Sequence, residues 1–463
     1  MDSEKENTLD QKEEKRSVGI SRRNFFKASG IAAGVAALGL VTKSQPVYAG
    51  QESESAIVNF AVQEVDQSPY NLPPFANAEN LKRYELGKNA FYSKELSMDK
   101  FGGNPWHIEA EKYIVKFIKE GVPGYSLMDN AFYDAAWASY KGTPLFSWEP
   151  LGVSNIKRAE TVGKWEATPE QNNRYIKKVA NEYGSGDTGV AVLNEQWFLS
   201  QDEKGKPYVF STEHSKPTIT EEAYYIPKTM NRVIVMLAPM NPNMLKYAPT
   251  TLSEATVGTE YSQMAESAGK MAEFIRGLGY NAIPMGNDAS LSVPIAIDAG
   301  LGELGRHGLL VHPEYGSSVR ISKVLTDLPI APDKPISFGA AEFCRTCMKC
   351  AEACPSESIS KDKDPSDKVA CASNNPGMKK WYVNTWTCLN QWVENGGGCN
   401  ICLSACPYNK PKTWIHDVVK GVSAKTTVFN STFATLDDAL GYGTHDKNPK
   451  EFWDSDKNVP KWW

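Results

Sequence analysis

Cysteine is absent from most of this chain. All nine cysteines of the 463 residues lie between Cys344 and Cys406, and the other 400 residues have none. A disulfide framework spreads its cysteines over distant loops, whereas metal ligands crowd together at short spacings. The clustering therefore predicts a metal or iron–sulfur site and argues against structural disulfides.

Strong net charge and long apolar runs are also missing. The formal net charge is -5 with 23% charged residues, which is mild and of the wrong sign for nucleic-acid binding. No segment after residue 49 has the roughly 18 consecutive apolar residues that a membrane span needs. With 41% hydrophobic residues, the composition excludes collagen, coiled coil and wholesale disorder. The length suffices for two or three hydrophobic cores.

The first 49 residues have the order of an export signal. Arg22-Arg23 is followed by Phe25, Phe26 and Lys27, then by an uncharged segment over 28–41 and by Pro46-Val47-Tyr48-Ala49. This pattern resembles a twin-arginine signal peptide, which exports folded proteins, and the alternative is a chance arginine pair before an apolar helix. We expect residues 1–49 to be removed and the protein to lie peripherally at the outer face of the cytoplasmic membrane. The segment carries +2, so the remainder carries -7.

The remaining chain divides into four predicted regions. Residues 50–164 are aromatic-rich and predict an irregular, partly helical region, and residues 165–330 predict an α/β core. The core is expected to have helices at 168–183, 260–278 and 293–299 and strands at 189–193, 233–237, 282–284 and 309–311. A proline-rich linker over 328–335 leads to an iron–sulfur domain at 331–415. Residues 416–463 are expected to be an extension that packs on the core.

The cysteine spacing reproduces the bacterial ferredoxin pattern. The first run ends in Cys354-Pro355, and the second, whose first cysteine is displaced upstream, ends in Cys406-Pro407. In such runs the fourth cysteine ligates the neighbouring cluster. We therefore expect two 4Fe-4S clusters, the first bound by Cys344, Cys347, Cys350 and Cys406 and the second by Cys354, Cys388, Cys399 and Cys402.

Zinc is the main alternative for these cysteines, because paired C-x2-C units also form zinc ribbons. Three cysteines at successive three-residue steps, and two Cys-Pro endings, favour clusters. Cys371 remains and is expected to be a plain thiol.

Several motifs together resemble the corrinoid-dependent reductive dehalogenases. They are the twin-arginine leader, Pro335-Ile336-Ser337-Phe338-Gly339 before Cys344, the displaced cysteine, and Gly441-Tyr442-Gly443 near the end. The resemblance implies an α+β or α/β fold, with a nitroreductase-like corrinoid-binding core and a C-terminal ferredoxin-like domain. It also implies a cobalamin-type corrinoid without a protein ligand to cobalt, and the chain has no Asp-x-His-x-x-Gly motif for such a ligand.

The same resemblance assigns catalytic residues. Tyr261, at the opening of a helix, matches the proton donor, Arg320 its supporting cation, and Asn287 an amide nearby. The side chains suit these roles, because a guanidinium beside a phenol favours the phenolate and eases proton release. Without the resemblance, Tyr261 would be taken for a packed core tyrosine and Arg320 for a surface arginine.

Other residues are expected near the corrinoid. Trp392 matches an aromatic that lines the cofactor pocket, although it could instead shield a cluster. Gly300 and Gly302 permit close backbone approach, either to the corrinoid or within plain turns. The remaining expected contacts come from Pro313 and from Arg306, with His307 beside it.

The resemblance implies an enzyme that replaces a carbon-bound halogen, in a small chlorinated aliphatic compound, by hydrogen in organohalide respiration. A Co(I) corrinoid fed by the two clusters would supply the electrons. A small membrane anchor protein and a quinol-linked membrane donor are the expected partners, with no nucleic acid. The alternatives are an exported ferredoxin-type electron-transfer subunit and an epoxyqueuosine reductase-like enzyme, and the acidic charge opposes the latter.

Overall fold

A four-stranded antiparallel sheet organises the core. In this computed structural model, the described residues are 62–66, 81–142, 144–152, 157–409 and 448–455. The strand order is β2–β6–β10–β7, formed by Asp187–Val192, Arg232–Pro239, Val319–Thr326 and Ala282–Met285. The predicted leader over 1–49 and the Gly441-Tyr442-Gly443 motif lie outside the described residues.

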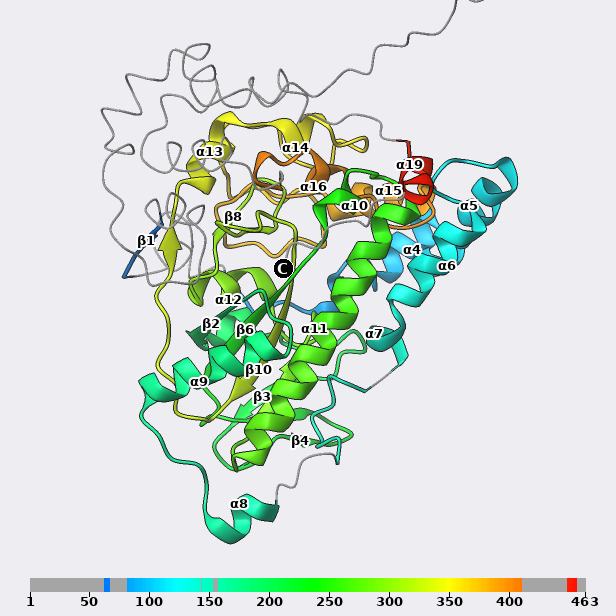
Figure 1. The fold of residues 1–463 in the computed structure, drawn as a ribbon. Coiled ribbons are helices and arrows are strands. Elements are labelled where there is room, and N and C mark those ends of the chain that lie inside the picture. The colour runs from blue at the N-terminus through cyan, green and yellow to red at the C-terminus, as the bar shows by residue number, and fades with distance from the viewer. Residues whose placement is uncertain (1–61, 67–80, 143, 153–156, 410–447, 456–463) are drawn as a thin grey trace, which may run out of the picture. The chain divides into compact units, whose positions relative to one another are not determined.

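Helices cover both faces of this sheet (Figure 1). On β6, Ile234 and Met236 pack with α9 (Pro169–Glu182) and α11 (Thr251–Gly277). The alternating Val233 and Val235 face the opposite layer, which contains α12 (Ser292–Asp298). Because both faces are buried, β6 is a continuous apolar run, as the sequence predicted.

Most predicted core elements are confirmed. The expected start of α9 is correct, because Thr168 and Gln171 form a reciprocal capping box and Pro169 occupies the first turn. The predicted strand at 309–311 is the short β9 (Leu310–Val311), which pairs with β8 (Glu303–Leu304).

Helix α11 begins nine residues before its predicted start at Glu260. Thr250 caps it by accepting a hydrogen bond from the Ser253 amide at 3.3 Å. The first two turns are buried on almost every side, so they show no amphipathic stripe to detect. The expectation that Tyr261 opens a helix is therefore wrong, since it lies well inside α11.

The expected linker over 328–335 is packed on the core. Leu328 and Ile330 are buried among side chains of α9 and α11. The Asp333 carboxylate accepts a hydrogen bond from the Val190 amide at 2.8 Å and pairs with Lys177 at 2.7 Å. This segment therefore runs along the edge strand β2 rather than hanging free.

Several strands were not predicted. The sheet strand β10 was missed, and a second sheet combines β3 (Tyr208–Ser211), β5 (Tyr224–Pro227) and β4 (Thr218–Ile219). A two-stranded pair joins β1 (Gln63–Glu64) to β11 (Ile336–Ser337).

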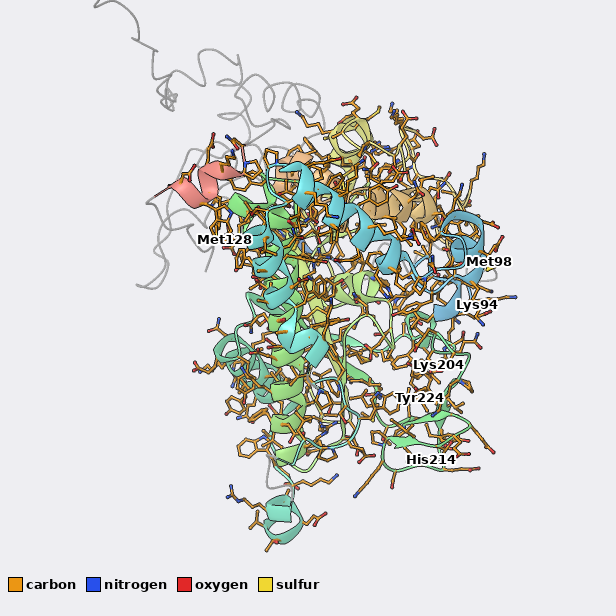
Figure 2. All side chains as sticks on the ribbon, turned by 90° about the vertical axis from the view of Figure 1, so that its right-hand side faces the viewer. Lys94, Met98, Met128, Lys204, His214 and Tyr224 are labelled. Carbon is orange, nitrogen blue, oxygen red and sulfur yellow. The ribbon has the colours of Figure 1, made fainter. Side chains whose placement is uncertain are left out.

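The region before the core is mainly helical, not irregular. It contains α4 (Lys94–Lys100), α5 (Trp106–Glu120), α6 (Leu127–Ala136), α7 (Ala138–Gly142) and α8 (Lys157–Val162). Figure 2 shows α4, α5 and α6 on one face, with the exposed Met98 and Met128 labelled.

The cysteine segment gathers at one end of the core. Its helices are α13 (Ala340–Thr346), α14 (Lys349–Glu352), α15 (Thr385–Glu394) and α16 (Ile401–Ala405), near the α10 (Pro242–Leu245) end of α11 (Figure 1). The described part of the C-terminal extension contains α19 (Lys450–Asp454), where Trp453 donates to Asp129 of α6 at 2.7 Å. That contact is with the N-terminal region, whereas Phe452 packs against Met244 and Leu252 of the core. The predicted packing of residues 416–447 lies outside the described residues.

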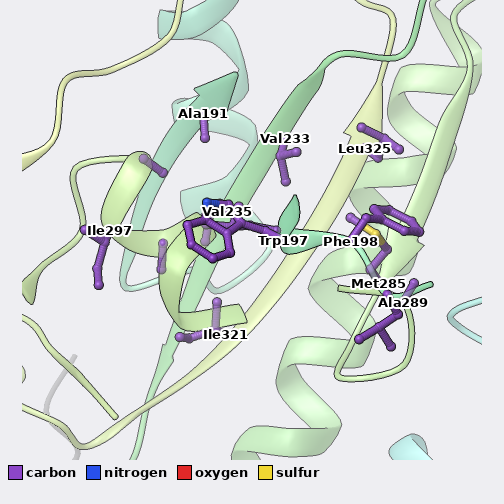
Figure 3. Close-up of a cluster of buried hydrophobic side chains, with 14 of the residues drawn as sticks. Ala191, Trp197, Phe198, Val233, Val235, Met285, Ala289, Ile297, Ile321 and Leu325 are labelled. Carbon is purple, nitrogen blue, oxygen red and sulfur yellow. The ribbon is translucent and has the colours of Figure 1, made fainter. Parts of the chain in front are cut away.

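Trp197 is the largest fully buried side chain of the layer that contains α12 (Figure 3). Its indole N–H donates to Asp298 at 2.9 Å. We expect Trp197→Ala to lower the free energy of unfolding by about 3–5 kcal/mol, because a large cavity forms and the carboxylate loses its donor. Trp165→Ala is the matched control: its indole also donates one hydrogen bond, but 44% of the residue is exposed. Equal losses of thermal stability in the two variants would contradict this prediction.

Candidate active site and iron–sulfur centres

Tyr261 lies in an aromatic box between α11 and the N-terminal helices. Its ring stacks on Trp137 with centroids 4.7 Å apart and planes at 26°. Tyr140 meets it edge-on at 5.0 Å and 70°. One turn earlier on α11, a Cβ at Gly258 would lie 2.6 Å from the Trp137 indole, so only glycine leaves space for this ring. The phenol ring is therefore held on two sides by aromatic side chains.

The structure brings the three predicted catalytic residues together. The Asn287 amide nitrogen donates to the Tyr261 hydroxyl oxygen at 3.0 Å. The Arg320 guanidinium carbon lies 5.0 Å from the centroid of the Tyr261 ring. Tyr261 comes from α11, Asn287 from the loop after β7, and Arg320 from β10. A phenol with an amide donor on its oxygen and a cation over its ring is suited to proton transfer.

More polar groups surround this phenol. Burial raises the pKa of Tyr92, and the charges of Glu203, Asp288 and Tyr261 add to that effect. Burial is also the main cause that raises the pKa of Tyr140, followed by the charge of Tyr261. For Asp288, burial raises the pKa while the charge of Lys323 opposes the shift. Partial burial thus raises the pKa of the tyrosines beside Tyr261, which keeps their hydroxyl groups neutral.

A cavity of about 340 Å³ includes Asn287 and Ser292 in its wall. Its lining joins α12 to the segment after β8 and to the cysteine segment, through Val293, Ile297, Gly308, Met378 and Lys380. The residue that donates to Tyr261 therefore also faces a space shared by the core and the cysteine segment.

Trp392 belongs to a separate aromatic group. Its ring lies 5.5 Å from Phe91 and 6.4 Å from Trp106. The next residue after Phe91 is Tyr92, which interacts electrostatically with Tyr261. The segment Phe91-Tyr92 thus links the surroundings of Trp392 to those of Tyr261, and the predicted corrinoid contact of Trp392 stays a prediction.

The segment 300–305, which contains Gly300 and Gly302, packs against the start of the cysteine segment. A Cβ at Gly300 would lie 2.3 Å from the Lys334 carbonyl oxygen, and one at Gly302 would lie 2.2 Å from that of Val311. Both glycines have positive φ, at 77° and 153°. Both glycines thus approach neighbouring main chain closely, and their predicted contact with the corrinoid stays a prediction. The Glu303 carboxylate, directly after Gly302, accepts a hydrogen bond from the Ala340 amide at 2.5 Å, at the start of α13.

Arg306 is fully buried and its guanidinium donates to main-chain oxygens of Cys344, Ser360 and Asp362. It also lies 4.6 Å from the Trp381 ring centroid. These contacts explain its position without a corrinoid. Pro313 is buried between β9 and β10, and the corrinoid contacts predicted for both residues stay predictions.

His307 is expected to make the fold acid-sensitive. Burial lowers its pKa to about 4, whereas an unfolded histidine has a pKa of about 6.5. Between these values the unfolded chain binds a proton that the folded chain does not, so stability is lost as the pH falls. The loss from this group approaches about 2 kcal/mol near pH 5. Thermal unfolding midpoints between about pH 7 and pH 5 should therefore fall less for His307→Gln than for the parent chain.

The eight predicted cluster cysteines form two neighbouring groups. The thiolate charges of Cys406 and Cys347 act on Cys344, whereas Cys388 and Cys354 act on Cys399. Burial, the largest cause, raises the pKa of Cys388 to about 11 and of Cys399 to about 12. Buried thiolates that repel one another require a cationic centre, which an iron–sulfur cluster provides.

All nine cysteines are free thiols in the structure. Within the described residues, no three His, Cys, Asp or Glu side chains converge tightly enough to bind a single metal ion. Cys371 contacts the Thr385 hydroxyl at 3.3 Å.

Comparisons with known proteins agree with this arrangement. Residues 184–330 match the family model for the reductive dehalogenase subunit, and residues 343–409 match that for a 4Fe-4S double cluster binding domain. A tetrachloroethene reductive dehalogenase of Sulfurospirillum multivorans is 31% identical over 489 residues, which covers 96% of this chain and 95% of the relative. The chain belongs to the reductive dehalogenase family.

Other members of the reductive dehalogenase family match over less of their length. The tetrachloroethene reductive dehalogenase of Desulfitobacterium hafniense is 35% identical over 68% of this chain, and the match spans 64% of that protein. The solved structure of the catabolic reductive dehalogenase NpRdhA with 3-bromo-4-hydroxybenzoic acid has a TM-score of 0.60 at 23% identity. It is covered over 49% of its length and shows the shared fold. An epoxyqueuosine reductase of Lactococcus garvieae matches only 37% of this chain.

Sequence reasoning missed the residues that support the three catalytic candidates. Trp137 and Tyr140 lie in the aromatic-rich N-terminal region, where periodicity gave no register. Gly258 lies before the predicted helix start. Lys323, in the unpredicted strand β10, is fully buried, and the charge of Asp288 acts on it. A lysine flanked by Ser322 and Val324 carries no motif signal.

Proposed function

We propose that this reductive dehalogenase family member replaces a carbon-bound halogen of a small organohalide by hydrogen. The observation that carries the proposal is the convergence of Asn287, Arg320 and the Tyr261 hydroxyl in an aromatic box. Each turnover consumes two electrons and one proton and releases one halide ion. Tyr261 is the proposed source of that proton, delivered from its hydroxyl oxygen to carbon.

The surrounding side chains prepare this proton transfer. The Arg320 cation over the ring and the Asn287 amide on the oxygen both favour the phenolate that remains after the proton leaves. The stacked Trp137 and edge-on Tyr140 hold the ring in place.

We propose a corrinoid and two 4Fe-4S clusters as cofactors. The structural neighbours include a reductive dehalogenase whose title names B12-dependent dehalogenation. When bound, the corrinoid would supply the low-potential electrons for cleavage of the carbon–halogen bond. Residues near the 340 Å³ cavity, with Asn287 and Ser292 in its wall, are candidates to hold part of it.

The arrangement of apolar clusters supports an order for the two iron–sulfur centres. Cys350 of the first group and Cys402 of the second border one cluster that contains Ile359. Cys402 and Tyr261 border another that contains Val257 and Leu403. The second centre is therefore the proposed immediate electron donor to the site around Tyr261.

The proposed substrates are chlorinated ethenes, ethanes or methanes. Two of the relatives named above are tetrachloroethene reductive dehalogenases, and the apolar cluster that Tyr261 packs against is lined by Trp137 and Leu309. A small apolar molecule fits such a pocket. The proposed site of action is the outer face of the cytoplasmic membrane, with a small anchor protein and a quinol-linked donor. No helix in the described residues combines the length and apolar character needed to cross a membrane.

Product analysis tests this proposal. The holoenzyme, reduced by a low-potential dye under anaerobic conditions, would be given tetrachloroethene, dichloroethane and a chlorophenol in separate assays. The expected result is a product with one chlorine replaced by hydrogen and release of one chloride. Corrinoid-loaded protein with full iron content and no dehalogenated product from any of these compounds would overturn the proposal.

A further inference from the structure

A chain of three hydrogen bonds connects a buried ammonium group to Tyr261. The Lys323 ammonium donates to the Ser292 hydroxyl oxygen at 2.6 Å, and the Ser292 hydroxyl donates to the Asn287 amide oxygen at 3.1 Å. The Asn287 amide nitrogen then donates to Tyr261 at 3.0 Å. Lys323 is fully buried on β10, three residues after Arg320.

Lys323 is also bound to the loop that carries Asn287. Its ammonium donates to the carbonyl oxygens of Gly286 at 2.5 Å and of Ser290 at 3.4 Å. An ammonium group has three donors, and this one meets three acceptors. The Lys323 ammonium therefore holds together three residues of the loop over 286–292.

The Lys323 ammonium decides which group donates and which accepts in each of these hydrogen bonds. An ammonium group can only donate, so the Ser292 oxygen must accept and its proton must point elsewhere. The Asn287 oxygen takes that proton, which turns the amide nitrogen toward Tyr261. Tyr261 is then an acceptor in this bond, and its own proton remains available to the pocket.

We propose that Lys323 is a positioning residue that acts through Ser292 and Asn287 to leave the Tyr261 hydroxyl proton directed at the substrate. With a neutral residue at position 323, the Ser292 hydroxyl and the Asn287 amide can both reverse their orientation. The Tyr261 hydroxyl can then donate its proton to the Asn287 oxygen. This inference rests on the proposed role of Tyr261 as proton donor.

Charged groups on neighbouring elements do not replace this function. Arg320 contacts the face of the Tyr261 ring, not its oxygen. Asp288, in the same loop as Asn287, interacts electrostatically with Lys323 and compensates its charge. Burial lowers the pKa of Lys323 to about 7, with Asp288 opposing the shift, and the three acceptors favour its charged form.

The test uses holoenzyme variants assayed for dechlorination of tetrachloroethene. Ser292→Ala breaks the chain but leaves the carbonyl contacts of Lys323, and Ser292→Thr retains the hydroxyl. We expect Ser292→Ala and Lys323→Met to lower kcat on the order of 10-fold to 100-fold with little change of KM, and Ser292→Thr to restore most of it. Corrinoid and iron content and the thermal unfolding midpoint, measured in parallel, separate this effect from misfolding.

A second background distinguishes positioning from general structural damage. If the chain acts through Tyr261, Ser292→Ala should cause no further loss in a Tyr261→Phe enzyme, although it is damaging in the parent enzyme. The same loss in both backgrounds, or unchanged kcat in well-loaded Ser292→Ala protein, would overturn the inference. Full activity of Tyr261→Phe alone would instead overturn the proposed role of Tyr261. Should Lys323→Met not fold, Ser292→Ala still decides.

Discussion

Tyr261→Phe is expected to reduce the rate of dechlorination by about 10²- to 10⁴-fold, the range attributable to a positioned general acid. The phenylalanine ring keeps its stacking on Trp137 and its place under the Arg320 cation. The substitution removes only the oxygen that accepts from Asn287 and carries the proposed proton. The loss should therefore appear in kcat, with corrinoid, iron and thermal stability nearly unchanged.

Tyr133→Phe provides the matched control. Tyr133 also packs against Trp137, with centroids 6.4 Å apart, but it borders a different apolar cluster, with Met244 and Leu252. Removal of its hydroxyl should leave kcat within about 2-fold of the parent value, since surface and peripheral changes have small effects. Steady-state rates with tetrachloroethene and a reduced dye decide the matter. Similar kcat values for Tyr261→Phe and Tyr133→Phe would remove Tyr261 from the proposed mechanism.

The elements that the sequence predicted correctly have strong local signals. The start of α9 is predicted by the capping residues Thr168, Pro169 and Gln171, whose hydrogen bonds are local and do not depend on tertiary contacts. The run from Val233 to Leu237 is apolar on both faces because helices cover both sides of the sheet. Its apolar character is therefore visible without knowledge of its neighbours.

Strand β10 lacked such a signal because its polar residues serve the site. Arg320 reaches the ring of Tyr261, and Lys323 holds the loop of Asn287. A central strand with both faces covered would ordinarily be apolar throughout. Arg320 and Lys323, which interrupt the apolar pattern of β10, are thus the residues that organise the candidate active site.

The aromatic rings around Tyr261 show a second limit of prediction from the sequence. The resemblance supplied Tyr261, Asn287 and Arg320, but their partners Trp137 and Tyr140 depend on how α6 and α7 lie along α11. That packing depends on Gly258, because the Trp137 indole occupies the space that a side chain at position 258 would need. A single glycine inside a helix carries little meaning until the neighbour that fills its space is known.

In the predicted ligand sets, the last cysteine of each run binds the cluster of the other run, so that Cys406 ligates the first cluster and Cys354 the second. This crossed assignment leads to a second prediction with a large effect. Cys402 lies in α16 and Cys406 directly after it, yet their surroundings differ. Cys402 interacts first with Cys388, whereas Cys406 is the strongest thiolate neighbour of Cys344. Cys406→Ala should therefore remove the cluster of the first run, and Cys402→Ala the other. Each variant should lose about half of the iron and nearly all turnover, since the electron route is broken.

Electron paramagnetic resonance of the reduced protein can identify which cluster each substitution removes. Under the crossed assignment, Cys406→Ala and Cys350→Ala leave the same remaining signal, and Cys402→Ala and Cys388→Ala leave the other. If each run instead bound its own cluster, Cys406→Ala would pair with Cys402→Ala. Cys371→Ala should retain all the iron, because its thiol contacts Thr385 and not the eight ligands. The pairing of spectra thus tests the ligand sets without reference to activity, and under the proposed electron order the cluster lost with Cys402, which packs against the same apolar cluster as Tyr261, is the one that feeds the site.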